Sequence, residues 1–259
     1  MQKKTMRLLL IGFAFLIVLI FAVLGMYTDW LFFQEVSYKD VFLTILSGKI
    51  LAGLIIGVLS FGFIFANILP IVKTKFPTLQ ISFANQYGIP LNSELLTRLS
   101  WRLGLVVSLI IGFLSGLWGS SLWYNILAFA NAASTGVQDP VFGKDIGFYL
   151  FKLPLYERLS HWAGFMIFLV LALVIFAYAI RGGFSFRNNR LFMTPVARRH
   201  VGFLASLFLI KIAFGFYLDR FGLLSSVHNI LVGANYTDIN ARLIALNILI
   251  VVTAIAGVA

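Results

Sequence analysis

The chain alternates between long apolar runs and shorter polar stretches. A helix needs about 20 apolar residues to cross the hydrocarbon core of a bilayer. Six runs approach that length, at residues 8–26, 50–69, 103–122, 162–180, 201–217 and 243–259. The last run is still apolar at Ala259, so we expect it to be an incomplete span. The pattern predicts an all-α, polytopic transmembrane helix bundle with five complete spans and a truncated sixth.

The composition favours an integral membrane protein. The chain of 259 residues is 61% hydrophobic and only 11% charged, whereas a soluble domain carries about 25% charged residues. It contains no cysteine, which excludes disulfides and thiolate metal sites. The net charge of +11 would indicate a nucleic-acid partner in a soluble protein. In a membrane protein we interpret it as basic cytoplasmic loops, so no nucleic-acid partner is predicted.

The charges divide unevenly between the two sides of the predicted bundle. If the spans alternate in direction, one side carries twelve Lys and Arg residues and a single acid, Glu94. The other side carries six basic and eight acidic residues. Cytoplasmic loops of membrane proteins hold the excess of Lys and Arg. We therefore predict a protein of the cell membrane with a cytoplasmic amino terminus, in contact with the lipid bilayer through these basic loops.

The predicted outer loops are rich in aromatic residues and include DPVFGKDIGFYLFKLPLYE, residues 139–157. The polar candidates for a functional site in this stretch are Asp139, Lys144 and Asp145. Rings beside hydrated charges are typical of a segment at the membrane interface, so we favour an interfacial anchor over a catalytic loop. The preceding NILAFANAA, residues 125–133, is weakly amphipathic and predicts a short interfacial helix.

Lys211 is the sharpest anomaly within the predicted spans, because it stands near the middle of SLFLIKIAFGF. A charge at mid-bilayer costs roughly 2.5–3.5 kcal/mol on insertion scales. No carboxylate lies within the predicted spans, so the partner of Lys211 would be carbonyl groups, water or a segment absent from this chain. Two hypotheses stay open: a site in a polar pathway or buried contact, and a lysine whose long stem reaches the interface.

Two further patterns predict contacts between or within helices. Asp238 and Arg242 are one helical turn apart near the start of the last run, and Thr237 is the expected N-cap there. The segments GLIIG at 53–57 and GFLSG at 112–116 are small-xxx-small patterns. Such patterns let helices approach closely, so we expect these glycines to pack within the bundle.

Motifs of known chemistry are missing from the sequence. It contains no P-loop, no dinucleotide fingerprint, no HExxH and no G-x-S-x-G. Zinc-type spacing of ligands is also absent. We therefore predict no catalytic residue, no cofactor and no metal, and an enzyme is the less favoured class. The residues kept as functional candidates are Lys211, Asp139, Lys144, Asp145, Asp238 and Arg242.

Four segments together resemble one family. They are YTDWLFFQEVSY at 27–38, DPVFGKDIGFYLFKLP at 139–154, YLDRFGLL at 217–224 and GANYTDINARL at 233–243. In order and spacing they are similar to uncharacterised protein family 0182, prokaryotic multi-pass integral membrane proteins of unknown function. The resemblance implies that this chain is an amino-terminal membrane part. It also implies that a last span and a large carboxy-terminal soluble domain, extracytoplasmic here, are missing. It brings no catalytic residue to carry over.

Three functions from different classes remain. The first is a membrane anchor or scaffold for the missing extracytoplasmic domain, in envelope assembly or export, with that domain and other membrane proteins as partners. The second is a transporter or channel component with Lys211 in a polar pathway. Such pathways usually carry several buried ionisable groups and broken helices, but the predicted spans hold about one such group and no internal proline. The third is a membrane enzyme acting on lipid-linked substrates. We favour the scaffold.

Overall fold

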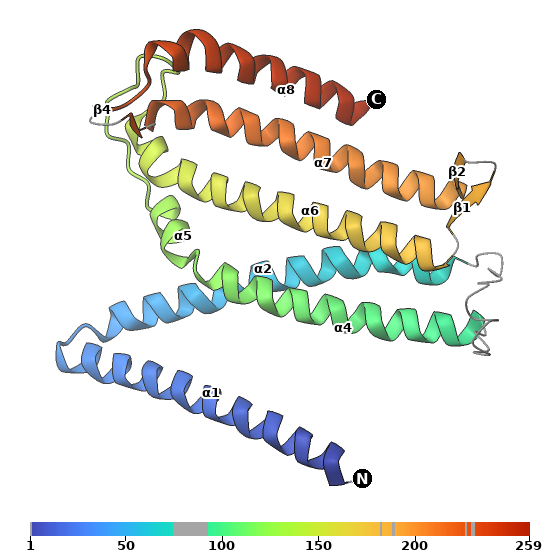
Figure 1. The fold of residues 1–259 in the computed structure, drawn as a ribbon. Helices are drawn as coiled ribbons and strands as arrows, with labels where there is room; N and C mark the ends of the chain where they lie inside the picture. The colour runs from blue at the N-terminus through green and yellow to red at the C-terminus, as the bar shows by residue number, and fades with distance from the viewer. Residues whose placement is uncertain (1, 75–92, 182, 188–189, 226, 229–230) are drawn as a thin grey trace. The chain divides into compact units, whose positions relative to one another are not determined.

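The computed structural model describes residues 2–74, 93–181, 183–187, 190–225, 227–228 and 231–259 (Figure 1). The α-helices are α1 (Gln2–Glu35), α2 (Lys39–Lys73), α4 (Ser93–Ser120), α5 (Trp123–Ala130), α6 (Leu153–Arg181), α7 (Pro195–Gly222) and α8 (Leu243–Val258). Single π-helical turns, η1 (Phe148–Lys152) and η3 (Asp238–Arg242), lead into α6 and α8, and a 3-10 turn, η2 (Leu223–Ser225), follows α7. Two short antiparallel hairpins pair β1 (Phe184–Arg187) with β2 (Arg190–Met193) and β3 (Val227–His228) with β4 (Leu231–Val232).

The predicted helical bundle is confirmed for five of the six apolar runs. In the described part of the chain, five helical segments are long and apolar enough to cross a membrane: Lys39–Lys73, Thr97–Ser120, Phe148–Arg181, Pro195–Ser225 and Asp238–Val258. They coincide with the second to sixth predicted runs. The first run, 8–26, lies within α1, where several side chains are outside the described residues. A short helix, α5 at Trp123–Ala130, overlaps the predicted helix at 125–133, and its place at the membrane interface stays a prediction.

The chain divides into two compact units, Met1–Leu51 and Ala52–Ala259. In the first unit the chain reverses direction after α1. Ser37 takes a φ of 63°, and the backbone N–H of Tyr38 donates to the carbonyl oxygen of Phe33 at 2.8 Å. The ring of Phe33 lies 5.9 Å from the ring of Phe42, whose side chain is buried. The turn is therefore held by both backbone and ring contacts.

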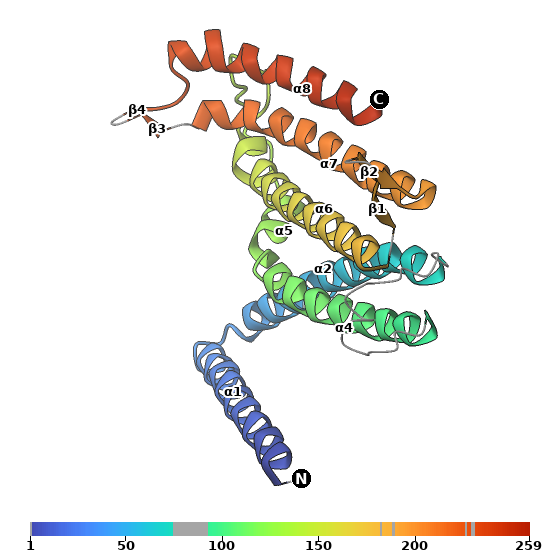
Figure 2. The same ribbon diagram turned by 45° about the vertical axis from the view of Figure 1, so that its right-hand side comes forward.

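In the second unit, α6, α7 and α8 lie side by side in that order (Figures 1 and 2). A core of buried side chains joins α2, α6 and α7: Ile64, Ile71, Met166, Val170, Val174, Tyr178, Ala197 and Leu204. At the far end of α8, a Cβ added to Gly257 would lie 2.9 Å from Ile210, so this glycine lets α8 approach α7 closely. Close packing rather than the hydrophobic effect holds helices together in lipid.

The two predicted glycine patterns pack against each other. A Cβ added to Gly53 on α2 would lie 2.9 Å from the carbonyl oxygen of Gly116 on α4. One added to Gly57 would lie 3.1 Å from the carbonyl oxygen of Gly112. The prediction that these glycines pack within the bundle is confirmed, because Gly53, Gly57 and Gly116 face backbone of the partner helix and Gly112 faces Phe61 and the carbonyl oxygen of Gly57.

Three helices extend beyond the apolar runs predicted for them. The helical segment of α6 begins well before residue 162 and includes Glu157, and α7 extends to Gly222 and includes Asp219. Glu157 and Asp219 lie outside the predicted runs at 162–180 and 201–217, so these two helices continue beyond those runs into sequence that carries acidic residues. Likewise α2 continues through Pro70, which directly follows the predicted run at 50–69. Below, "loop end" means the end of the second unit that carries residues 131–147, and "hairpin end" means the end that carries β1 and β2.

Candidate functional site

Asp139 organises the turn at the start of the aromatic loop. Its Oδ1 accepts from the backbone N–H groups of Val141 and Phe142 at 2.9 and 2.6 Å. Its Oδ2 accepts from the backbone N–H of Lys144 and the hydroxyl of Tyr149, both at 2.8 Å. Partial burial raises the pKa of this carboxyl, but the four hydrogen bonds to the ionised form outweigh it and hold the pKa below its usual value.

Asp145 plays the same part for the preceding segment. The hydroxyl of Ser134 donates to its Oδ2 at 2.6 Å, and the backbone N–H groups of Thr135 and Gly136 donate at 3.1 and 3.0 Å. The N–H of Gly147 donates to its Oδ1 at 2.7 Å. The bond from Ser134, followed by those from the backbone, holds the pKa of Asp145 far below its usual range.

The two predicted carboxylates therefore fold their own loop. Asp139 and Asp145 are close in sequence, but the oxygens of each carboxylate accept hydrogen bonds from different backbone N–H groups. A carboxylate that is this well solvated by donors and has a lowered pKa is a poor general base near neutral pH. The side chain of Lys144 is exposed, while its backbone N–H donates a hydrogen bond to Asp139.

The loop lies against α7 through its rings. Phe142, Phe148 and Tyr149 surround Phe221, with ring centroids 5.0, 5.2 and 6.3 Å from it. The guanidinium of Arg220 lies over the ring of Phe142 at 5.9 Å. Edge-to-face ring pairs and cations over rings each stabilise such contacts. The rings of this segment are thus used for packing on protein.

Asp238 and Arg242 form the predicted pair, within η3. Asp238 is 1% exposed, and its Oδ1 accepts from Arg242 at 2.8 Å. The cap differs from the expectation: Thr237 has helical angles and makes no side-chain cap. Asn235 takes that role, because its side-chain oxygen accepts from the N–H of Asp238 at 2.8 Å while its own N–H donates to Asp238 at 3.0 Å. The reciprocal bonds resemble a capping box.

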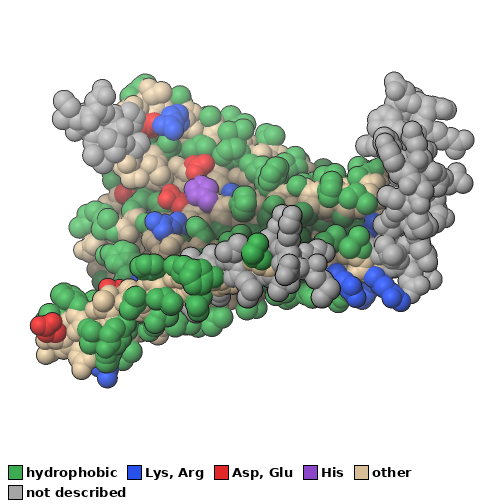
Figure 3. Space-filling view, turned by 60° about the horizontal axis from the view of Figure 1, so that its bottom comes forward, with side chains coloured by type: hydrophobic (Ala, Val, Ile, Leu, Met, Phe, Trp, Pro, Cys, Tyr) green, Lys and Arg blue, Asp and Glu red, His purple; other side chains and the backbone are tan. Residues whose placement is uncertain are grey.

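Arg242 also lines a cleft of about 410 Å³ at the loop end, between α6, α7 and α8. The cleft holds two carboxylates, Glu157 from α6 and Asp219 from α7. Sequence reasoning missed both, because it began the fourth span at 162 and ended the fifth at 217. On the face drawn in Figure 3, acidic and basic side chains gather in a patch, while hydrophobic side chains cover much of the remaining described surface.

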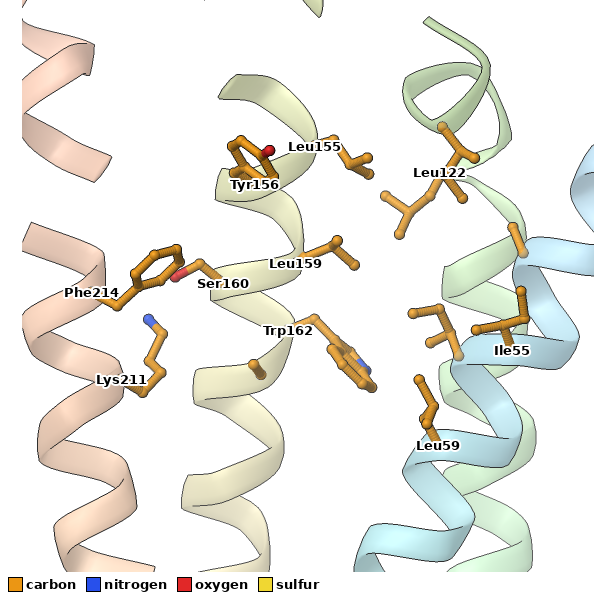
Figure 4. Close-up of a pocket in the computed structure, with 14 residues that line it drawn as sticks. Ile55, Leu59, Leu122, Leu155, Tyr156, Leu159, Ser160, Trp162, Lys211 and Phe214 are labelled. Atoms are coloured by element: carbon orange, nitrogen blue, oxygen red, sulfur yellow. The ribbon is translucent and has the colours of Figure 1, made fainter. Parts of the chain in front are cut away.

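Lys211 lies on the face of α7 that meets α6. A Cβ added to Gly164 on α6 would lie 2.8 Å from Cε and 2.9 Å from Nζ of Lys211, so the lysine stem rests on the bare backbone of this glycine. Ser160, one turn earlier on α6, is 7% exposed. Figure 4 shows Lys211 and Ser160 pointing into the same space beside Phe214. Among the described residues, neither the ammonium of Lys211 nor the hydroxyl of Ser160 has a hydrogen-bond or ion-pair partner.

Lys211 and Ser160 belong to the wall of a groove of about 510 Å³ that crosses α6 (Figure 4). One side of the groove is formed by Ile55 and Leu59 of α2 and by Leu122 before α5. Ile126 of α5 also lines this side. The opposite side comes from α6 and α7, and the exposed wall is almost wholly apolar. The buried Nε1 of Trp162, also in this wall, has no hydrogen-bond partner among the described residues.

A second polar group lies toward the hairpin end and was missed from the sequence. The hydroxyl of Tyr178 and Nδ1 of His200 are 3.0 Å apart, and Nε2 of His200 lies 3.0 Å from Oδ1 of Asn67. The amide nitrogen of Asn67 donates to the carbonyl oxygen of Phe63 at 2.7 Å. Since Oδ1 can only accept, Nε2 donates to it, Nδ1 accepts, and Tyr178 donates. These hydrogen bonds join α2, α6 and α7.

The Lys211 groove and the His200 chain are separated by apolar side chains. Met166, Val170 and Val174 on α6 and Leu204 on α7 are each 3% exposed or less. From Met166 to Val174 this layer spans roughly 12 Å along the helix, at about 1.5 Å per residue. The described residues therefore provide no continuous polar route between the two groups.

Long apolar helices joined in sequence define a multi-pass membrane protein. The model of the Uncharacterised protein family (UPF0182) matches residues 6–259, so the chain belongs to that family. This confirms the family resemblance seen in the four aromatic segments.

Curated relatives are bacterial UPF0182 proteins. The chain is 40% identical to one from Geobacter sp. (strain M21) over 258 residues, which cover 100% of this chain and 29% of the relative. It is 38% identical to one from Geotalea uraniireducens over 257 residues, 99% of this chain and 29% of the relative. A protein from Rhodococcus opacus is 33% identical over 233 residues, 89% of this chain and 23% of the relative. The chain thus spans less than a third of the length of these relatives. No solved structure matches it.

Proposed function

We propose that this chain acts as a membrane anchor and scaffold for an extracytoplasmic part of a longer protein, in envelope assembly or export. The observation that carries the proposal is the use of the loop-end carboxylates. Asp139 and Asp145 hold the backbone of their loop, and the loop's rings pack on Phe221 of α7. A loop fixed in this way presents a defined surface rather than a reactive group. The greater length of the curated relatives supports the same function.

The proposed orientation places the amino terminus in the cytoplasm of a cell-membrane protein. It rests on the excess of Lys and Arg in the sequence at the hairpin end, where cytoplasmic loops are expected to be basic. The loop end, with most of the acidic residues, then faces away from the cytoplasm. The extracytoplasmic part would meet the membrane chain there.

A transporter or channel component is the second candidate, and Lys211 is the observation that favours it. An unpaired ammonium in the middle of a span marks many polar pathways. The apolar layer at Met166, Val170 and Leu204 weighs against a continuous path in this conformation. An enzyme acting on lipid-linked substrates is supported less, because its proposed acids, Asp139 and Asp145, are engaged by their own loop.

Two measurements test the proposal. The chain has no cysteine, so Lys144→Cys and Arg198→Cys each introduce one exposed thiol, at the loop end and the hairpin end. On intact cells a membrane-impermeant maleimide should label Lys144→Cys, and it should label Arg198→Cys only after permeabilisation. The reverse pattern would remove the basis for an extracytoplasmic partner.

The second measurement separates scaffold from transporter. The full chain in proteoliposomes should give no potential-driven proton or potassium flux above that of protein-free vesicles. A flux that is present in the parent and lost in Lys211→Leu would establish the transporter instead. Lys49→Leu is the matched control, because Lys49 lies on α2 outside the groove and is exposed.

A further inference from the structure

We propose that the groove across α6 binds a single-chain membrane lipid with a small anionic head, of the fatty-acid class. Its oxyanion lies against Lys211 and Ser160, and its hydrocarbon chain lies along the apolar wall toward α2 and α5. This site is independent of the scaffold proposal, which rests on the loop end.

The shape of the groove fits one hydrocarbon chain. A volume of about 510 Å³ lies within the range of ordinary small-ligand sites, roughly 300–1,000 Å³. Its wall is formed by aliphatic and aromatic side chains of α2, α6 and α7, such as Leu59, Leu159 and Phe214. Because the wall as a whole, with Lys211 and Ser160 included, exposes almost no polar surface, the body of the ligand must be apolar.

The polar groups at the α7 side of the groove are a cation and a hydroxyl, which favour an anionic ligand. The ammonium of Lys211 is an obligate donor, and among the described residues no acceptor is paired with it. The hydroxyl of Ser160, more than nine-tenths buried, has no partner in the part of the chain that the structure describes and points into the same space (Figure 4). A carboxylate accepts from both groups at once and neutralises the charge, which is costly to leave unpaired in an apolar site.

The protein's own carboxylates do not supply this anion within the groove. Glu157, which precedes Ser160 on α6 by three residues, lines the separate loop-end cleft with Asp219. No acidic residue lines the groove itself in the described part of the chain. The counter-charge therefore comes from a ligand, and the apolar wall selects one that partitions into the bilayer.

Glycines make room for the cationic end of the site. Any side chain at Gly164 would overlap the lysine, since an added Cβ lies 2.8 Å from Cε. At Gly215 on α7 an added Cβ would lie 3.6 Å from Nζ, in ordinary contact. Past the groove, the buried Met166 and Val170 close the space between α6 and α7. The anionic head of the ligand therefore stays at Lys211, because these side chains block its movement toward the hairpin end.

The test uses the full chain in nanodiscs of zwitterionic phosphatidylcholine with a photoactivatable palmitate as the probe. Irradiation should cross-link the probe to peptides that line the groove, those containing Leu59 or Leu159. Lys211→Met should weaken palmitate binding by roughly tenfold or more, as expected for the loss of a charge-assisted hydrogen bond. Ser160→Ala should weaken it less. Lys49→Met, a lysine change outside the groove, should leave it unchanged.

Competition identifies the ligand class. Unlabelled palmitate should displace the probe, whereas hexadecanol, which has the same chain and no charge, and inorganic phosphate, which has charge and no chain, should not. Equal binding in Lys211→Met and Lys49→Met, with both variants giving the helical circular dichroism of the parent, would overturn the proposal. Displacement by hexadecanol as strong as that by palmitate would overturn it as well, because the site would then not distinguish a charged ligand from an uncharged one.

Discussion

Gly53 on α2 and Gly116 on α4 meet backbone to backbone: a Cβ added to Gly53 would lie 2.9 Å from the carbonyl oxygen of Gly116. Backbone cannot move aside as a flexible side chain can. Gly53→Ala should therefore destabilise the protein by about 1–3 kcal/mol, the usual cost of overpacking. Unfolding in mixed micelles with increasing dodecyl sulfate, followed by circular dichroism, measures this change.

Gly62 provides a matched control on the same helix, because a Cβ added there meets nothing within 4 Å. Gly62→Ala should be neutral or stabilise by up to about 1 kcal/mol, since alanine favours the helix. Equal effects of the two substitutions would show that the α2–α4 contact does not depend on close approach.

The pKa of Asp145 leads to a prediction about pH. A carboxyl whose pKa is lowered in the folded loop stabilises that loop above its unfolded pKa of about 3.9. This stabilisation is lost only as the pH falls through the lower, folded pKa. A nitroxide attached to Lys144→Cys should therefore show constant mobility from neutral pH down to about 4, and greater mobility in stronger acid.

Asp145→Asn should raise the mobility of that nitroxide already at neutral pH, because an amide cannot accept from Ser134, Thr135 and Gly147 as a carboxylate does. Ser134→Ala, which removes one donor, should have a smaller effect. A loop that stays as immobile in Asp145→Asn as in the parent would contradict the role given to this carboxylate.

The chain of Tyr178, His200 and Asn67 should contribute measurably to stability. Tyr178→Phe leaves Nδ1 of His200 without this donor and should cost about 1 kcal/mol, a typical value for a hydrogen bond between membrane helices. His200→Phe should cost more, because Oδ1 of Asn67 also loses its donor. In a double-mutant cycle the two changes should be less than additive. Strict additivity would mean that the hydrogen bond has no energetic weight.

The buried carboxylate of Asp238 should matter more than its exposed partner. Asp238→Ala removes the acceptor of both Arg242 and the backbone of Asn235, and should destabilise by about 1–3 kcal/mol. Arg242→Gln should cost less, because the arginine side chain is 60% exposed and water replaces part of the interaction. Asn240→Ala, an exposed change in the same turn, is the control. A larger effect for Arg242→Gln than for Asp238→Ala would contradict this order.

The features predicted correctly from the sequence are those that depend on a short spacing between residues of one helix. The pair Asp238–Arg242 and the glycine patterns at 53–57 and 112–116 depend on residues three or four apart on one helix. Contacts between distant residues left no such signal. His200 and Asn67 are 133 positions apart, and neither residue is unusual near the end of a span.

The environment of Lys211 shows the same division. The sequence identified an unusual charge in an apolar run. It did not identify Gly164, against which the lysine stem packs, or Ser160, whose hydroxyl has no partner among the described residues. Those two residues lie on α6, and only the packing of α6 against α7 brings them to the lysine. The rings of the loop at 139–157 led to the prediction that it lies at the membrane interface, and that location stays a prediction. The structure shows that these rings pack on Phe221 and that the carboxylates accept from neighbouring N–H groups.

By itself the sequence determined the class of the protein, the number and approximate position of its apolar runs, and its family. It could do so because each helix meets the requirements of the bilayer by itself. About 20 consecutive apolar residues, with their backbone hydrogen bonds made inside the helix, can cross the hydrocarbon core independently of the neighbouring helices. Only the tertiary structure decided which polar groups meet, where α6 and α7 begin and end, and that a groove crosses α6 beside Lys211. Those features depend on the rotation and close approach of helices, which local hydropathy does not encode.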